Sequence, residues 1–234
     1  MYKYKDKARY SLVNNKGYIP PHQILNYFQN CSSEQSEVIG KGVKYMMSQK
    51  KAWVLLGYKL VIQRPIKYEE ELIVGTEPTG FKGFFGRRNY CIMDTEENYI
   101  VQADSLWTLI DMEERGPVRI TEENFSGYTL GQSFENVKAA RKLRFKSEGE
   151  PKGEFEVLKN YIDNNGHMNN ANYLMLADEF LPSIEDIAEI DIAFIKEAML
   201  GQKMEAYVHD EEEGIGVSFM VDGEEACKIL ARTR

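Results

Sequence analysis

The chain has 234 residues, of which 43% are hydrophobic and 12% aromatic, and its net charge is −8 at pH 7. This composition supports a packed core and excludes intrinsic disorder, and no apolar run is long enough for a transmembrane helix. Three widely spaced cysteines show no metal-ligand or disulfide pattern, and no apolar segment typical of a signal peptide follows the basic N-terminus. We therefore expect a cytoplasmic protein.

Charge is unevenly distributed along the chain. Residues 1–120 carry 17 Lys/Arg and 14 Asp/Glu, residues 121–150 carry 5 of each, and residues 151–234 carry 7 and 18. An acidic partner is therefore expected to prefer the first half or the middle segment. Neither half is basic enough to favour nucleic acid.

The first 120 residues predict a unit of helix and strands. A strand near Tyr4–Val13 leads to two prolines, Pro20 and Pro21, which are typical of a helix start, and the helix continues through Phe28. Four strands are predicted after the helix, at Trp53–Gln63, Glu71–Pro78, Gly86–Asp94 and Tyr99–Asp111.

Residues 151–234 predict a second unit of similar order, and residues 121–150 a linker with glycine and serine but little apolar periodicity. A strand near Gly153–Lys159 precedes a helix that starts at about Asn170 and ends by Pro182. Four strands are then expected, at Ile190–Ala198, Lys203–His209, Gly214–Val221 and Ala226–Arg232.

The similar order of the two units indicates a weak internal repeat. When the two helices are aligned, Gly17 lies opposite Asp163 and Pro21 lies opposite His167. The first unit would then keep the scaffold without the acid/base groups. A coincidental α+β order is the alternative.

The most informative segment is Asp163–Tyr173, with the sequence DNNGHMNNANY directly before and into the second predicted helix. It combines a carboxylate, an amide, a glycine and an imidazole. A helix N-terminus offers unpaired backbone N–H groups and a positive dipole end, which suit a developing oxyanion. Acid/base groups beside such donors favour acyl chemistry.

Several residues of this segment also have ordinary structural explanations. Asp163 and Asn165 are candidate site residues, yet both types also cap helices and form turns. Asn169 and Asn170 are interpreted as N-cap or turn residues. The backbone N–H groups at this helix start are the expected donors to an oxyanion. Gly166 is expected where the backbone needs positive φ or a close approach.

Two motifs resemble those of known enzymes. The active-site signature of hotdog-fold thioesterases is similar to Asp163-x-x-Gly166-His167-x-Asn169-Asn170-x-x-Tyr173. The catalytic motif of acyl-[acyl carrier protein] (acyl-ACP) thioesterases of plants and bacteria is similar to Asp163-x-Asn165-x-His167. That family's strand with a catalytic glutamate resembles Ile192–Ala198, where Glu197 takes the glutamate position. Ala198 replaces the cysteine of some plant members, so no thiol role is expected there.

The resemblance covers nearly the full chain and implies an α+β double hotdog, two tandem repeats of a long helix wrapped by an antiparallel β-sheet. The N-terminal hotdog, 1–120, would mainly shape the acyl pocket. The C-terminal hotdog, 151–234, would carry the chemistry, joined to the first by the linker 121–150. Two fused hotdogs already supply the pair that single-hotdog proteins obtain by dimerising, so homodimer formation is left open.

The implied reaction is hydrolysis of acyl-ACP thioesters to free fatty acid and carrier protein, terminating fatty acid synthesis, without metal or organic cofactor. Glu197 and His167 would activate water, and Asn165 with helix N–H groups would hold the oxyanion. Asp163 would orient His167 or Asn165, or would itself be base or nucleophile. The alternatives are an acyl-CoA thioesterase on the same fold and a non-catalytic acyl-binding hotdog sensor.

Two further segments have both a functional and a structural interpretation. A cluster of cations in the linker predicts a docking strip for the acidic carrier or simply a solvated linker: Lys138, Arg141, Lys142, Arg144 and Lys146, with Lys41, Lys44, Lys50 and Lys51 as allies. Met46–Met47 and Trp53–Leu56 either line an acyl pocket or pack in the core.

Overall fold

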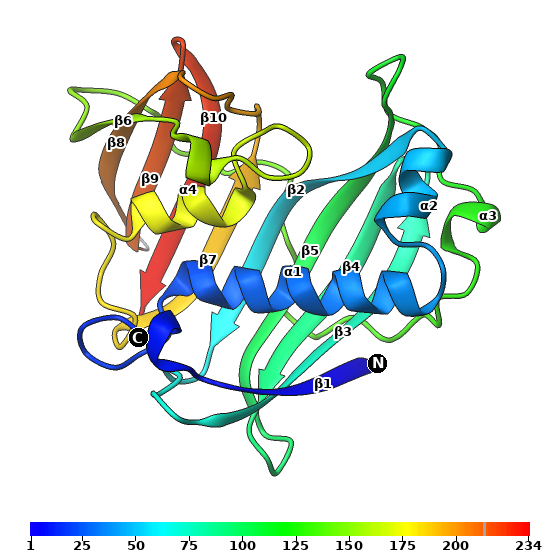
Figure 1. Ribbon diagram of the computed structural model, residues 1–234. Helices are drawn as coiled ribbons and strands as arrows, with labels where there is room; N and C mark the ends of the chain where they lie inside the picture. The colour runs from blue at the N-terminus through cyan, green and yellow to red at the C-terminus, as the bar shows by residue number, and fades with distance from the viewer. Residues whose placement is uncertain (213) are drawn as a thin grey trace.

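The computed structural model describes residues 1–212 and 214–234. Within these ranges, ten strands form one antiparallel sheet in the order β1-β3-β4-β5-β2-β7-β10-β9-β8-β6, with helices on one face (Figure 1). The strands are Tyr2–Lys7 (β1), Lys51–Ile62 (β2), Glu71–Lys82 (β3), Phe85–Met93 (β4), Tyr99–Asp111 (β5), Gly153–Glu156 (β6), Ile187–Phe194 (β7), Lys203–Glu211 (β8), Gly214–Val221 (β9) and Glu224–Thr233 (β10). The helices are Pro21–Val38 (α1), Val43–Ser48 (α2), Glu122–Phe125 (α3) and Asn170–Ala177 (α4), with 3₁₀ turns at Tyr10–Leu12 (η1) and Lys159–Tyr161 (η2).

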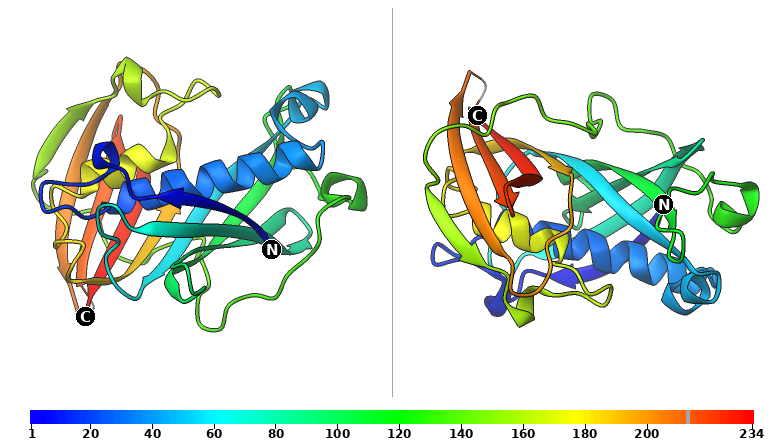
Figure 2. Two further views of the ribbon diagram at one scale, coloured as in Figure 1. Left: turned by 60° about the horizontal axis from the view of Figure 1, so that its bottom comes forward. Right: turned by 90° about the horizontal axis from the view of Figure 1, so that it is seen from above.

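We call the sheet face covered by α1 and α4 the helix face, and the opposite one the outer face (Figures 1 and 2). The buried stripe of α1 recurs at helical spacing and includes Ile24, Leu25 and Phe28. The Phe28 ring stacks on Tyr90 of β4 with ring centroids 4.9 Å apart. Burial of one such side chain stabilises the fold by roughly 2 kcal/mol, so this contact fixes α1 on the sheet.

The two halves meet where β2 pairs with β7. The register places Tyr58 opposite Ile192 and Leu60 opposite Ile190, and all four side chains are buried. Lys59, between them in the sequence, points to the other face, where it forms an ion pair with Glu189. One apolar core therefore continues beneath both helices.

Each half repeats the same strand order, β1-β3-β4-β5-β2 in the first and β6-β8-β9-β10-β7 in the second. The pairing register repeats as well, since Val74 lies opposite Ile92 and Ala206 lies opposite Phe219. The expected α+β double hotdog is confirmed. The second helix is not long, however: α4 has 8 residues against 18 in α1.

Several local predictions differ from the structure. The expected strand Tyr4–Val13 is divided into β1 and the 3₁₀ turn η1, and helix α2 was not predicted. The expected strand Ile190–Ala198 ends at Phe194. It ends there because the N–H groups of Ile195 and Lys196 both donate to the carbonyl of Ala226, so the chain leaves the ladder.

The expected linker crosses the outer face of the sheet from one half to the other (Figure 2). Its Val137, Ala139 and Phe145 are buried, and the intervening cations are exposed. The Ala139 N–H donates to Asp104 Oδ2 at 2.7 Å, and Lys228 Nζ donates to the Phe145 carbonyl at 2.5 Å. The segment is therefore packed and hydrogen-bonded rather than solvated on all sides.

Among the described residues, no helix combines the length and the apolar character needed to cross a bilayer.

Candidate active site

The segment before α4 folds into a tight turn. The Asp163 N–H donates to the His167 carbonyl at 2.8 Å, and the Gly166 N–H donates to the Asp163 carbonyl at 3.1 Å. Gly166 has φ of +82°, in the left-handed region where a side chain is disfavoured. The glycine therefore has the conformational role expected from the sequence.

Asn169 is the N-cap of α4, and Asn170 is its first residue. The Asn169 Oδ1 accepts from the Ala171 N–H at 2.9 Å, and its carbonyl accepts from the Asn172 N–H at 2.9 Å. These two helix donors are therefore already used. Within the described part of the chain, the N–H groups of His167 and Asn170 have no hydrogen-bond partner, and they are the donors left for an oxyanion.

Glu197 lies in the β7–β8 loop and not on a strand. The loop is fixed on both sides of it, because the Lys196 N–H donates to Ala226 and the Ala198 carbonyl accepts from the Met168 N–H at 2.8 Å. The Tyr173 hydroxyl also donates to the Lys196 carbonyl at 3.4 Å. Burial raises the pKa of Tyr173, so this donor keeps its proton.

The loop anchors bring the expected acid/base groups together. His167 Nε2 and Glu197 Oε2 are 3.1 Å apart, although 29 residues of chain lie between them. The two side chains are 31% and 52% exposed, so the pair is accessible to a substrate and to water. A carboxylate beside an imidazole fixes the ring and its tautomer.

Asp163 and Asn165 form a separate pair. Asp163 Oδ1 accepts from the Asn165 N–H at 2.8 Å, and Asp163 Oδ2 accepts from the Asn165 side-chain amide at 3.4 Å. Among the described residues, no side-chain hydrogen bond joins Asp163 to His167. Of the two residues that Asp163 was expected to orient, the hydrogen bonds join it to Asn165.

The first half contains the same turn with different side chains. The Asn14 N–H donates to Tyr18, the Gly17 N–H donates to Asn14, and Gly17 has φ of +80°. Gly17 is therefore the counterpart of Gly166, and the predicted alignment of Gly17 with Asp163 was wrong by three residues.

The corrected alignment shows what replaces each candidate site residue. Counted from the paired glycines, the counterparts of Asp163, Asn165 and His167 are Asn14, Lys16 and Tyr18. The Ile19 N–H donates to Ile66 as Met168 donates to Ala198, so Pro65 stands in the place of Glu197. The first copy thus has no acid/base pair at these positions. This agrees with the prediction that the first unit keeps the scaffold without the acid/base groups.

The first half contributes one side chain that sequence reasoning missed. Gln29 on α1 accepts a hydrogen bond at 3.4 Å from the side-chain amide of Asn169, the cap of α4. This contact helps to decide which end of the Asn169 amide faces the helix. No local pattern marks Gln29, because it is an ordinary polar residue on the exposed side of α1.

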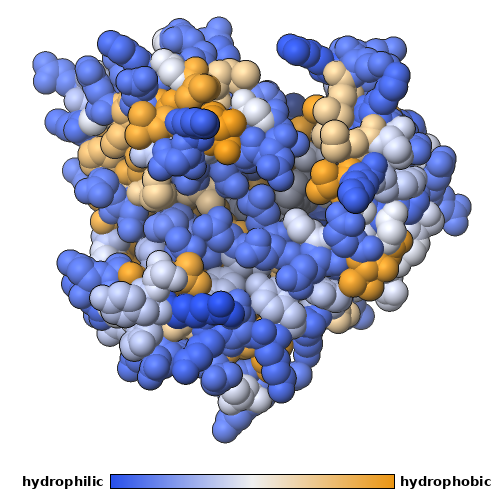
Figure 3. Space-filling model, in the orientation of Figure 1, coloured by the Kyte–Doolittle hydropathy of each residue, from blue (hydrophilic) through white to orange (hydrophobic). Residues whose placement is uncertain are grey.

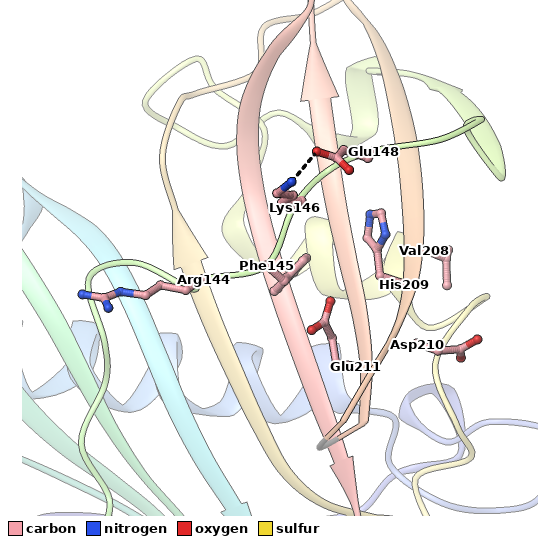
Figure 4. Close-up of a pocket in the computed structure, with 8 residues that line it drawn as sticks. All are labelled: Arg144, Phe145, Lys146, Glu148, Val208, His209, Asp210 and Glu211. Carbon is pink, nitrogen blue, oxygen red and sulfur yellow. Dashed lines mark ion pairs between the residues drawn. The ribbon is translucent and has the colours of Figure 1, made fainter.

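Two grooves lie away from the His167–Glu197 pair. One of about 650 Å³ is lined by Phe145, Lys146 and His209 on the outer face of the second half (Figure 4), where Lys146 forms an ion pair with Glu148. Another of about 570 Å³ lies between Phe155, Phe180 and the side of α4. Among the described residues, no group of His, Cys, Asp and Glu is arranged to hold a metal ion.

Solved structures of the same fold include three thioesterases. An acyl-ACP thioesterase from Bacteroides thetaiotaomicron is 21% identical, with 99% of this chain and 97% of that chain covered and a TM-score of 0.89. A putative oleoyl thioesterase from Lactobacillus plantarum is 20% identical, with 100% and 95% covered and a TM-score of 0.87. The 12:0-ACP thioesterase from Umbellularia californica is 16% identical, with 100% and 98% covered and a TM-score of 0.85. A comparison with curated protein sequences gives no match.

Family models give the assignment. The acyl-ACP thioesterase N-terminal domain matches residues 1–128, and the acyl-ACP thioesterase C-terminal domain matches residues 146–233. Together they span most of the chain, and each model corresponds to one half of the repeat. The chain therefore belongs to the acyl-ACP thioesterase family and is a thioester hydrolase of fatty acid metabolism.

Proposed function

We propose that His167 and Glu197 are the acid/base pair that hydrolyses the acyl-ACP thioester. The supporting observation is the 3.1 Å separation of His167 Nε2 and Glu197 Oε2. When Nε2–H donates to the carboxylate, Nδ1 is the basic nitrogen of the neutral ring. It then takes a proton from the attacking water, while Glu197 stabilises the imidazolium that forms.

Hydrolysis proceeds in two steps at this site. Water adds to the thioester carbonyl as His167 takes its proton, and the negative charge develops on the carbonyl oxygen. In this scheme the carbonyl oxygen accepts from the Asn165 side-chain amide and from the Asn170 N–H, one of the two N–H groups left without a partner, and one such donor lowers a barrier by about 3 kcal/mol. The C–S bond then breaks, His167 returns the proton to the thiolate, and the products are a fatty acid and the carrier thiol.

Asp163 acts through Asn165 in this scheme. Its two oxygens hold the backbone and the side-chain amide of Asn165, so the amide needs little reorganisation when the oxyanion forms. Asp163 is thus a positioning residue, and the role of base belongs to the His167–Glu197 pair.

We infer a reducing compartment, the cytoplasm, as the place of action. Cys31, Cys91 and Cys227 are buried free thiols, and burial raises the pKa of Cys31 to about 12, so these groups remain as unreactive thiols.

The cationic strip, Lys138, Arg141, Lys142, Arg144 and Lys146, is exposed throughout. It lies on the outer face, across the sheet from α1 and α4 (Figure 2). We propose that it attracts the acidic carrier to the outer face, without touching the thioester. Lys146 contributes least, because Glu148 neutralises it at 3.1 Å.

The carrier preference gives the test of the proposed function. We expect kcat/KM for one saturated acyl chain to be at least about tenfold higher on ACP than on coenzyme A, because only the protein carrier meets the strip. Initial rates of thiol release on both esters measure this ratio. A higher value on coenzyme A would assign the protein to acyl-CoA hydrolysis, and tight acyl binding without thiol release would make it a sensor.

Charge reversal tests the strip itself. Changing Arg141, Lys142 and Arg144 to Glu is expected to raise KM for acyl-ACP roughly tenfold at low ionic strength, and less at high salt. Rates on the coenzyme A ester should not change. The matched control reverses three exposed lysines elsewhere, Lys5, Lys67 and Lys82. Equal losses on both esters, or equal losses in the control, would mean that the strip does not recognise the carrier.

A further inference from the structure

The Tyr173 hydroxyl lies against the loop that carries Glu197. It donates to the Lys196 carbonyl at 3.4 Å. Burial raises the pKa of Tyr173, and the Ala198 N–H, a hydrogen-bond donor to the same oxygen, opposes that rise. One hydroxyl group therefore contacts the backbone of the residue directly before Glu197 and of the residue directly after it.

The tyrosine is itself held firmly in place. Its side chain is 2% exposed, and its ring packs edge-on against Phe194 and Phe219, with ring centroids 5.9 and 6.0 Å away. A hydroxyl buried to this extent needs hydrogen-bond partners, because an unpaired one loses its hydration without compensation. The contact of Tyr173 with the loop therefore stabilises both the helix side and the loop side.

The side chains of the loop do not fix it. Three large apolar side chains of the loop are 45% to 60% exposed: Ile195, Met199 and Leu200. Figure 3 shows apolar surface at the upper left, over the end of the second half where this loop lies. Lys196 forms an ion pair with Glu224, but both side chains are exposed, so the pair stabilises little. Hydrogen bonds to the loop backbone therefore decide where Glu197 lies.

The first half keeps a backbone anchor of this kind without the hydroxyl. The Gln63 N–H donates to the Ile100 carbonyl at the end of β2, as the loop after β7 donates to the strand beside it. Counted from the paired glycines, Ile24 takes the place of Tyr173, and it is equally buried. Both copies thus use this position for packing, whereas only the copy with Glu197 has a hydroxyl there.

We propose that Tyr173 is a positioning residue, whose hydroxyl holds the backbone on both sides of Glu197 and so keeps the carboxylate beside His167. Without this hydroxyl, the loop keeps its outer anchors, but the segment from Lys196 to Ala198 can turn. The carboxylate then spends less time in contact with the imidazole. Tyr173 itself transfers no proton. This inference rests on the proposed role of Glu197 in hydrolysis.

Replacement of Tyr173 by Phe removes the hydroxyl and keeps the packing of the ring. We expect kcat on one saturated acyl-ACP ester to fall roughly tenfold, because a small displacement of a reacting group is costly. KM should stay within about twofold of the native value. The loss of one buried hydrogen bond should lower the melting temperature by roughly 2–4 °C. Steady-state hydrolysis and a melting curve give these values.

Tyr27→Phe is the matched control in the first half. Tyr27 is a buried tyrosine of α1, and its hydroxyl donates to the Lys7 carbonyl at 3.3 Å. Its replacement removes the same kind of hydrogen bond, so a similar loss of melting temperature is expected, with native kcat. If the two variants lose kcat equally, or if Tyr173→Phe does not fold, the Tyr173 hydroxyl serves stability alone and the proposal is wrong.

A second measurement tests whether Tyr173 acts through Glu197. In the Glu197→Gln background, Tyr173→Phe should lower kcat by less than about twofold, because the charge that it positions is already absent. A tenfold loss in both backgrounds would show that Tyr173 acts independently of Glu197. Native kcat in Tyr173→Phe, together with a slow Glu197→Gln, would overturn this inference alone. Native kcat in Glu197→Gln would instead overturn the proposed function.

Discussion

Replacement of His167 by Ala is expected to lower kcat on acyl-ACP by about a hundredfold or more. The variant keeps the turn, the helix cap and Glu197, but it lacks the imidazole that takes the proton from water in the proposed scheme. KM should change little, because the acyl chain and the carrier contact other surfaces. Steady-state hydrolysis gives kcat, and circular dichroism with a melting curve shows whether the fold is intact.

His209→Ala is the matched control for this experiment. His209 lines the groove on the outer face and packs against Phe145 with ring centroids 6.0 Å apart, so it is remote from Glu197. Its replacement should leave kcat unchanged. If His167→Ala keeps more than about a tenth of the native kcat, the imidazole is not the base.

Local patterns predicted the parts of the fold that depend on near neighbours. The strands at Tyr99–Asp111 and Gly214–Val221 have the predicted bounds. The turn with Gly166 and the helix start at Asn170 were also predicted, because glycine and asparagine act on their own backbone. The buried alternation of Val137 and Ala139 was missed, since the rest of that segment contains many cations.

The error in the repeat alignment has a physical origin. Residues three or four apart lie on the same face of a helix, so a shift by three keeps apolar residues opposite one another. In the corrected alignment Ile24 and Leu25 lie opposite Tyr173 and Leu174, and all four are buried. The turn before the helix decides between these alignments, because only there do the positive-φ glycines have to coincide.

The contact between Glu197 and His167 could not be predicted from local sequence. Glu197 reaches His167 because Ala226 and Met168 hold the β7–β8 loop at both ends, and these anchors depend on strand pairing far along the chain. The family resemblance alone indicated Glu197. The contact of Gln29 with Asn169 depends on how α1 and α4 pack, which neither helix encodes separately.

Replacement of Glu197 by Gln decides which carboxylate supports the chemistry. The amide has the same shape but no charge, so it cannot stabilise an imidazolium on His167. We expect kcat to fall by about a hundredfold or more with little change in melting temperature. Asp163→Asn should cost only about tenfold, because its contribution is to orient one oxyanion donor. Rates on one acyl-ACP ester give the ratio of the two losses.

Glu179→Gln, at an exposed position just beyond α4, is the matched control and should behave as the native protein. If Glu197→Gln is as active as the control and Asp163→Asn is inactive, the base or nucleophile is Asp163. A nucleophilic Asp163 would pass through an acyl-enzyme, so rapid quenching of the native protein would trap label on that residue. General-base catalysis by His167 leaves no such adduct. The double variant that combines Glu197→Gln with Asp163→Asn separates the schemes further. If two residues act on one proton transfer, the loss of kcat in the double variant is smaller than the product of the two single losses.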